Sequence, residues 1–151
     1  MTGQSLTVRP IKDADRVEWE RLWDLYLDFY GTGVSQDVRD TYFARLLGDD
    51  AQDFNGFLAL LDGKPVGLVH YLFHRHGWKI ENVCYLQDLY ALPETRGTGV
   101  GRALIEAVYQ AADDAGAPSV YWLTQEGNAT ARRLYDRIAK ATDFIKYQRA
   151  L

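Results

Sequence analysis

The sequence predicts a layered α/β (α+β) domain in which helices cover a mixed β-sheet. Two segments, residues 13–31 and 35–48, carry apolar side chains at helical spacing. Residues 54–75 contain two apolar runs of strand length around a turn signal, and strand-like and helix-like runs alternate after residue 81. The expected element order is β-α-α-β-β-β-α-β-α-β, in a single domain over residues 1–151.

The first three elements follow from alternation and from helix signals. Residues 5–11 (SLTVRPI) alternate in the way a half-buried strand does. The first helix has one apolar and aromatic face and ends at Gly31. The second begins at Ser35, a good N-cap residue, and ends at Gly48.

The middle of the chain predicts three consecutive strands. The first two are joined by a hairpin turn at the Asp62-Gly63 pair. Residues 81–92 (ENVCYLQDLYAL) form the third strand, which Pro93 ends.

In the last third of the chain, predicted helices and strands alternate. Residues 101–117 carry one apolar face and end around Gly116, which predicts a helix. Residues 118–125 read as a strand, residues 128–141 as a helix, and residues 143–151 as a final strand.

Composition excludes several classes of protein. The formal net charge of −4 argues against nucleic-acid binding, which depends on lysine and arginine neutralising phosphates. One cysteine, Cys84, allows neither an internal disulfide nor a zinc site built on cysteine pairs. The N-terminal residues have no apolar signal region, and no segment is apolar enough to span a membrane, so a cytoplasmic protein is expected.

The histidines do not predict a metal site. His70, His74 and His76 lie in one short segment. On a strand, His70 and His74 would be about 13 Å apart at 3.3 Å per residue, too far for one ion. No metal is expected.

Three glycines mark the most informative segment. Gly97, Gly99 and Gly101 alternate between an apolar run and an amphipathic one, and each would cost about 1 kcal/mol relative to alanine inside a helix. Glycines between a strand and a helix let backbone N–H groups approach a ligand, and the helix N-terminus adds positive partial charge. This pattern predicts an anion site suited to phosphate.

Familiar phosphate loops do not match. The P-loop needs a different glycine spacing and a lysine, which are missing here. The dinucleotide motif G-x-G-x-x-G fails because Arg102 stands where its third glycine belongs. The length of the chain and the lack of kinase partner motifs exclude a kinase loop.

The pattern Arg96-x-x-Gly99-x-Gly101 resembles the pyrophosphate loop (Q/R-x-x-G-x-G/A) of the GNAT superfamily of N-acetyltransferases. Downstream, NATARRLYDRIA resembles the second motif of that family, in which an asparagine opens a helix and a tyrosine follows seven residues on, here Asn128 and Tyr135. The resemblance covers nearly the whole chain, and the two motifs look most like those of polyamine and Hpa-type acetyltransferases. It implies a GNAT fold, with a mixed, mostly antiparallel sheet and helices on both faces.

The resemblance also implies that acetyl-CoA is the acetyl donor. It places the pyrophosphate on the glycine loop and the pantetheine arm along the third predicted strand of the middle segment. The residues implied to bind acetyl-CoA are Leu89, Tyr90, Ala91, Arg96, Gly97, Thr98, Gly99, Val100, Gly101, Arg102, Asn128 and Tyr135.

Acetyl transfer requires a polarised thioester carbonyl and a proton donor for the leaving thiolate. By resemblance, a break in the strand ladder leaves the backbone N–H of Leu89 free for the acetyl oxygen. Tyr135 is the implied general acid, since a tyrosine hydroxyl stays protonated until the thiolate forms. A core tyrosine on an amphipathic helix is the structural alternative for this residue.

The group that deprotonates the amine stays open. Polyamine acetyltransferases often carry a Glu-Asp pair where this chain has Gln87-Asp88, and an amide cannot act as a base. Asp88 could act through water, bind a cationic acceptor, or simply be a hydrogen-bonded strand carboxylate. On a regular strand it faces away from Gln87, and a bulge would change its side. Glu81, Glu126 and solvent are the other candidates.

We expect the acceptor to lie near the end of the first helix, where the family shapes its acceptor pocket. Asp28, Tyr30, Gln87 and Asp88 are the expected acceptor-binding residues. The expected function is transfer of an acetyl group to a small cationic amine or amino acid. A protein lysine or N-terminal acetyltransferase and a non-catalytic acyl-CoA-binding module are the alternatives.

The C-terminus departs from the family pattern. DRIAKATDFIKY lacks the usual glycine, which predicts an extra turn on the last helix and a displaced final strand. Since that strand often helps to build a dimer in this family, a homodimer is expected.

Overall fold

The computed structural model describes residues 5–151, and its centre is one five-stranded sheet. The strands lie in chain order, so each pairs with its neighbour in sequence. The first four are antiparallel, and the fifth joins in parallel. They are β1 (Leu6–Pro10), β2 (Asn55–Leu61), β3 (Lys64–His74), β4 (Val83–Ala91) and β5 (Val120–Tyr121).

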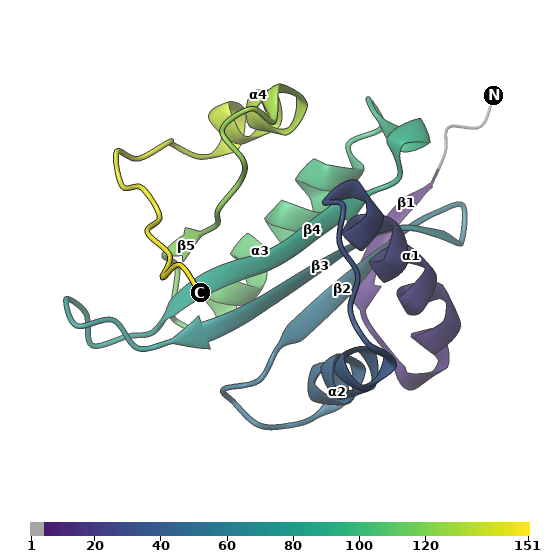
Figure 1. The fold of residues 1–151 in the computed structure, drawn as a ribbon, viewed down its shortest axis with the longest axis horizontal. Coiled ribbons are helices and arrows are strands. Elements are labelled where there is room, and N and C mark those ends of the chain that lie inside the picture. The colour runs from purple at the N-terminus through teal and green to yellow at the C-terminus, as the bar shows by residue number, and fades with distance from the viewer. Residues whose placement is uncertain (1–4) are drawn as a thin grey trace.

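Helices cover both faces of this sheet (Figure 1). One face carries α1 (Arg16–Phe29) and α2 (Gln36–Leu47), and the other carries α3 (Val100–Asp114). α4 (Ala129–Ile138) lies beside the N-terminal end of α3. Short 3-10 turns, Asp13–Asp15 and Pro93–Thr95, precede α1 and α3.

β3 shows how closely the two helical layers are packed. A Cβ atom on Gly67 would lie 2.8 Å from the Tyr90 carbonyl oxygen and 3.0 Å from Val100, so α3 rests directly on the backbone. Three residues on, His70 faces the opposite layer, where it contacts Trp19 of α1. Both faces of the central strands are therefore buried.

Local sequence signals fix several element ends as predicted. The Ser35 hydroxyl accepts a hydrogen bond from the Val38 N–H at the start of α2. The Asn128 side chain caps α4 in the same way, by accepting from the Ala131 N–H at 3.3 Å. Asp62 and Gly63 both have positive φ, as a tight hairpin between β2 and β3 requires.

The predicted C-terminal elements are partly wrong. β5 has two residues instead of eight, α4 ends at Ile138 without an extra turn, and residues 143–151 form no strand. The final segment pairs with none of the five strands, and its apolar side chains are exposed, Phe144 to 82% and Tyr147 to 89%. A strand needs a partner as well as an apolar pattern, and β5 offers a two-residue one.

Within residues 5–151, no helix combines the length and the apolar character needed to cross a membrane.

Candidate active site

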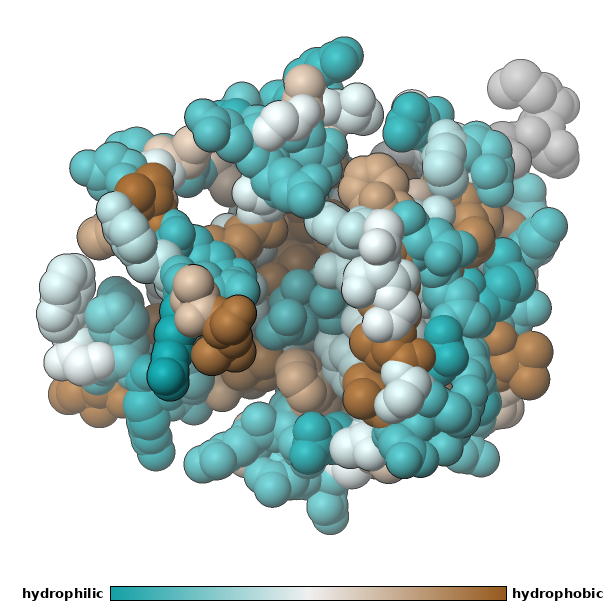
Figure 2. All heavy atoms as spheres, viewed as in Figure 1, coloured by the Kyte–Doolittle hydropathy of each residue, from teal (hydrophilic) through white to brown (hydrophobic). Residues whose placement is uncertain are grey.

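The candidate site lies where β4 and β5 separate. β5 pairs with β4 at two positions, Cys84 with Val120 and Tyr85 with Tyr121. Beyond these, the outer edge of β4 from Leu86 to Ala91 has no strand partner in the described part of the chain. Figure 2 shows this face of the molecule hollowed between the α4 side and the α1–α2 side.

A β-bulge interrupts β4 beside this opening. His70 of β3 pairs with Asp88 of β4, whereas the next residue, Tyr71, pairs with Leu86. Gln87 is therefore the extra residue, and its side chain is exposed. A bulge changes the side on which the following residues lie. This is how Asp88 comes to face the α1–α2 layer.

Asp88 is a buried carboxylate at the centre of a hydrogen-bond network. It is 5% exposed. Its Oδ1 atom accepts from the Tyr26 hydroxyl at 2.9 Å, and its Oδ2 atom accepts from the Tyr42 hydroxyl and from His70 Nδ1, the latter at 2.9 Å. One carboxylate thus connects α1, α2, β3 and β4. The sequence predicts a role at the site for Asp88 but for none of its three partners.

Trp19 fixes the tautomer of His70. The Trp19 indole N–H donates to His70 Nε2 at 2.9 Å, and both side chains are fully buried. An indole nitrogen can only donate, so Nε2 must accept and the imidazole proton must lie on Nδ1. His70 therefore donates to Asp88. The protons are therefore donated in sequence, from Trp19 to His70 and from His70 to the Asp88 carboxylate.

Burial keeps the two tyrosines of the network protonated. Burial raises the pKa of Tyr26 and of Tyr42 far above the usual value of 10, and the charge of Asp88 raises both further. Each hydroxyl thus remains a donor to the carboxylate throughout the physiological range.

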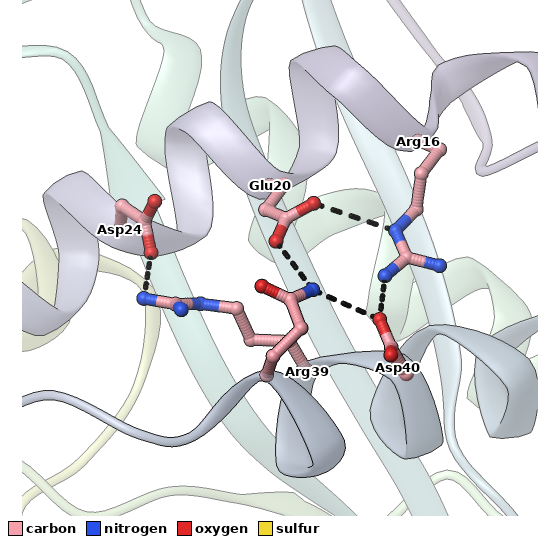
Figure 3. A network of polar contacts seen from close by, with 6 residues as sticks. Arg16, Glu20, Asp24, Arg39 and Asp40 are labelled. Carbon is pink, nitrogen blue, oxygen red and sulfur yellow. Dashed lines mark hydrogen bonds and ion pairs between the residues drawn. The ribbon is translucent and has the colours of Figure 1, made fainter.

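Polar contacts between α1 and α2 hold the helices that supply these tyrosines (Figure 3). Arg16 of α1 pairs with Asp40 of α2, and Arg39 of α2 pairs with Asp24 of α1. Gln36 of α2 adds to the first pair by donating to Asp40 at 2.9 Å and to Glu20, a second partner of Arg16, at 3.0 Å. Exposed pairs contribute about 0–1 kcal/mol each, so the value of this network lies in fixing how α1 sits on α2.

The glycine loop presents the N-terminus of α3 without a cap. Gly97 and Gly99 have positive φ, and the space around their Cβ positions is open. Gly99 is the N-cap residue and offers no side chain to the first-turn N–H groups. Arg102, on this first turn, pairs with Glu106. Backbone donors and the helix dipole together suit an anion.

Tyr135 lies on α4 near this loop. A Cβ atom added to Gly101 would lie 3.3 Å from Leu134, the neighbour of Tyr135, so α4 lies close to the start of α3. The Tyr135 ring packs edge-on against Trp122 at 5.3 Å, and burial raises the pKa of Tyr135 to about 12, with a smaller contribution from Tyr30. Among residues 5–151 its hydroxyl has no hydrogen-bond partner. A half-buried, protonated hydroxyl is thus available on the α4 side.

The other predicted residues lie at different depths. Leu89, Tyr90 and Ala91 are half-buried and in register with β3. Asp28 and Tyr30, at the end of α1, are exposed. Of the histidines outside the network, His74 contacts the Tyr121 hydroxyl and His76 accepts from the Trp78 N–H.

A groove of about 950 Å³ adjoins the site on its α4 side. It lies between β5, α4 and residues 139–146, and Tyr135 forms part of its wall. The glycine loop and the open edge of β4 lie outside it.

Known proteins are similar to this chain in sequence and in fold. The profile of the acetyltransferase (GNAT) family matches residues 19–139. A D-amino-acid N-acetyltransferase (HPA3) of Saccharomyces cerevisiae is 39% identical over 151 residues, covering 99% of this chain and 93% of the relative. This chain belongs to the GNAT family of N-acetyltransferases.

Other relatives of this GNAT protein are more distant. A thialysine N-epsilon-acetyltransferase of Caenorhabditis elegans is 27% identical over 84 residues, 56% of this chain and 52% of the relative. The solved structure of the aminoglycoside N-acetyltransferase AAC(6')-Iy in complex with CoA has a TM-score of 0.84 at 20% identity, covering 99% of this chain and 97% of the other. The predicted fold class and family are confirmed.

Proposed function

We propose that this GNAT protein transfers the acetyl group of acetyl-CoA directly to the primary amine of a small amino acid or similar small cationic amine. The observation that carries the proposal is the opening between β4 and β5 beside the uncapped N-terminus of α3. An unpaired strand edge can bind an extended ligand arm, and the helix terminus can bind its phosphates.

The residues present fit acetyl-CoA. Open space at Gly97 and Gly99 lets the backbone of residues 96–102 approach a pyrophosphate. We infer that Leu89, Tyr90 and Ala91 pair with the pantetheine arm. Asn128 supports this site by starting the helix that carries Tyr135.

The chemistry needs one donor at the carbonyl and one at sulfur. We assign the backbone N–H of Leu89 to the acetyl oxygen, where a pre-aimed donor contributes about 2.7–4 kcal/mol. Tyr135 donates a proton to the departing thiolate, and its pKa of about 12 keeps that proton in place until the thiolate forms.

The acceptor would lie on the α1 side of the opening. Gln87 and Asp88 border it at the bulge, and Asp28 and Tyr30 at the end of α1. Carboxylates in this position favour an ammonium group. The name of the yeast relative, a D-amino-acid N-acetyltransferase, makes D-amino acids the first acceptors to test.

The decisive experiment measures CoA release from acetyl-CoA by the purified chain. The acceptor panel contains D- and L-amino acids, thialysine, polyamines, aminoglycosides and lysine peptides. We expect release with amino acids. Release with lysine peptides alone would identify a protein acetyltransferase, and acetyl-CoA binding without release by any amine would identify a binding module.

We also propose a cytoplasmic homodimer without nucleic-acid or membrane partners. The net charge of −4 and the exposed apolar side chains of residues 143–151 support this proposal. Light scattering at micromolar concentration tests it, and a monomer mass would contradict it.

A further inference from the structure

The proposed reaction lacks a group to take the proton of the acceptor. An ammonium group has no lone pair to attack a thioester, and an alkyl amine has a pKa near 10. At the bulge, the exposed Gln87 is an amide and cannot serve. Asp88 is adjacent and carries a carboxylate, but it is buried beneath aromatic side chains.

The hydrogen bonds of Asp88 leave one route for a proton. Oδ2 accepts from both His70 and Tyr42, which occupies both of its lone-pair directions. Oδ1 accepts from Tyr26. Among the described residues, the Tyr26 hydroxyl is therefore the group through which a proton can reach the free side of the carboxylate.

Tyr26 stands between Asp88 and the opening. Its ring stacks on Trp23 at 5.1 Å, and its other neighbours are Tyr30 at 5.1 Å and Tyr90 at 6.3 Å. Tyr90 belongs to the open edge of β4, and Tyr30 is close enough to Tyr135 to raise the pKa of that residue. Tyr26 thus lies beside Tyr90 at the open edge of β4 and beside Tyr30, which approaches Tyr135.

Among residues 5–151, no lysine or arginine pairs with Asp88. The ionisable groups that face it are Tyr26 and Tyr30 from α1, Tyr42 from α2, His70 from β3 and Tyr85 from β4. A cationic acceptor that enters from the opening would therefore approach one carboxylate, Asp88, and several tyrosine hydroxyl groups.

We propose that Tyr26 and Asp88 form the base system of this enzyme: Tyr26 accepts the proton of the acceptor ammonium while passing its own proton to Asp88 Oδ1. The proposal rests on the acetyltransferase function proposed above. His70, held by Trp19, is a positioning residue that keeps Oδ1 turned toward Tyr26.

The steps balance. The ammonium N–H proton moves to the Tyr26 oxygen, the Tyr26 proton moves to Asp88, and a neutral amine remains. The amine nitrogen attacks the carbonyl carbon, the C–S bond breaks, and the thiolate takes the Tyr135 proton, which the second amine proton replaces through solvent. An ammonium and acetyl-CoA thus give an amide, the CoA thiol and one proton, which Asp88 returns to solvent through Tyr26.

The chain offers a matched pair of variants. Tyr26→Phe and Tyr42→Phe each remove one hydroxyl donor from the same carboxylate and keep the ring. We expect Tyr26→Phe to lower kcat about 100-fold with the acceptor found in the CoA-release assay, because general-base catalysis contributes at least that much. Tyr42→Phe should lower it less than about tenfold, the value of one hydrogen bond. KM for acetyl-CoA should stay the same in both.

The pH profile separates a relay from a packing defect. Free amine needs no relay, so the ratio of wild-type to Tyr26→Phe activity should shrink as the pH approaches the pKa of the acceptor. A packing defect would leave that ratio constant. Equal losses in the two variants, or a constant ratio, would overturn the relay.

NMR of the imidazole nitrogens tests the positioning role without turnover. In the wild type we expect a His70 signal with the proton on Nδ1. Trp19→Phe removes the indole donor, and its His70 signal should show a mixture of tautomers and a slower Tyr26-dependent kcat. A wild-type proton on Nε2 would overturn this part. If the wild type turns over no amine, the proposed function fails, and the relay fails with it.

Discussion

The surroundings of Asp88 depend on the preceding residue, Gln87, which has no pairing partner on β3. At the residue scale, the bulge at Gln87 turns the following carboxylate toward α1 and α2. A regular strand would have directed Asp88 to the α3 layer. One unpaired residue therefore decides which helices the carboxylate can contact and, in the proposed mechanism, which side of the sheet receives the acceptor.

Replacing Tyr135 tests the acid at this same scale. Tyr135→Phe keeps the ring against Trp122 and removes the proton donor. We expect kcat to fall at least about 100-fold, while the Kd for acetyl-CoA stays within a factor of two to three of wild type. Titration calorimetry and CoA release measure the two quantities. Unchanged turnover would remove Tyr135 from the mechanism.

The pH dependence follows from the sign of the Tyr135 shift. Burial raises its pKa to about 12, so the protonated, donating form is present at all lower pH values. We therefore expect loss of the Tyr135 proton to cause no falling limb in kcat/KM before pH 10. A falling limb near pH 9 that disappears in Tyr135→Phe would contradict this assignment.

At the scale of elements, the two ends of α3 provide a matched experiment. Gly99 precedes the helix with φ +85°, and Gly116 follows it with φ +69°, both in open space. Aspartate at either position pays a similar backbone cost of about 1–2 kcal/mol. Gly99→Asp should also place a negative charge at the pyrophosphate site and abolish acetyl-CoA binding, whereas Gly116→Asp should bind normally.

Calorimetry with acetyl-CoA and a thermal melt of each variant check this prediction. Similar losses of stability with different affinities would support the loop assignment. Equal affinities in the two variants would refute it.

Elements with their own local signals were predictable from the sequence. Ser35 and Asn128 cap the helices expected of them, and the Asp62-Gly63 turn has the positive φ values its residue types favour. Residues 143–151 lack such a signal. Their alternating apolar pattern suits a strand, but pairing depends on an edge elsewhere in the fold, and no local pattern reports that.

The contacts of the Asp88 network could not be predicted from the sequence for a related reason. Trp19 and His70 are 51 residues apart, and Tyr42 and Asp88 are 46 apart. Their spacing along the chain indicates which face each occupies but not which side chains meet. The family motifs, in contrast, are continuous in sequence, so the loop and Tyr135 could be proposed as site residues from the sequence.

At the scale of the whole molecule, stability is unevenly distributed. The central strands and α3 are buried, whereas α4 has no fully buried residue. We expect amide hydrogen exchange to be slowest in β2, β3, β4 and α3, and fast in α4. Acetyl-CoA should slow exchange in α4, because a ligand in the opening would contact Tyr135. Exchange in α4 as slow as in α3 without ligand would contradict this picture.

Cys84 lies in β4 with no exposed surface, and burial raises the pKa of its thiol to about 12. The reactive thiolate is a very small fraction of the thiol far below that pKa, so at pH 8 the folded chain should resist thiol reagents that modify the unfolded chain rapidly. A disulfide-exchange dye in native and denaturing buffer measures both rates. Since the sequence has no other cysteine, the enzyme would be invisible to such a dye, and every thiol that appears in its presence could be counted, second by second, as one completed turnover.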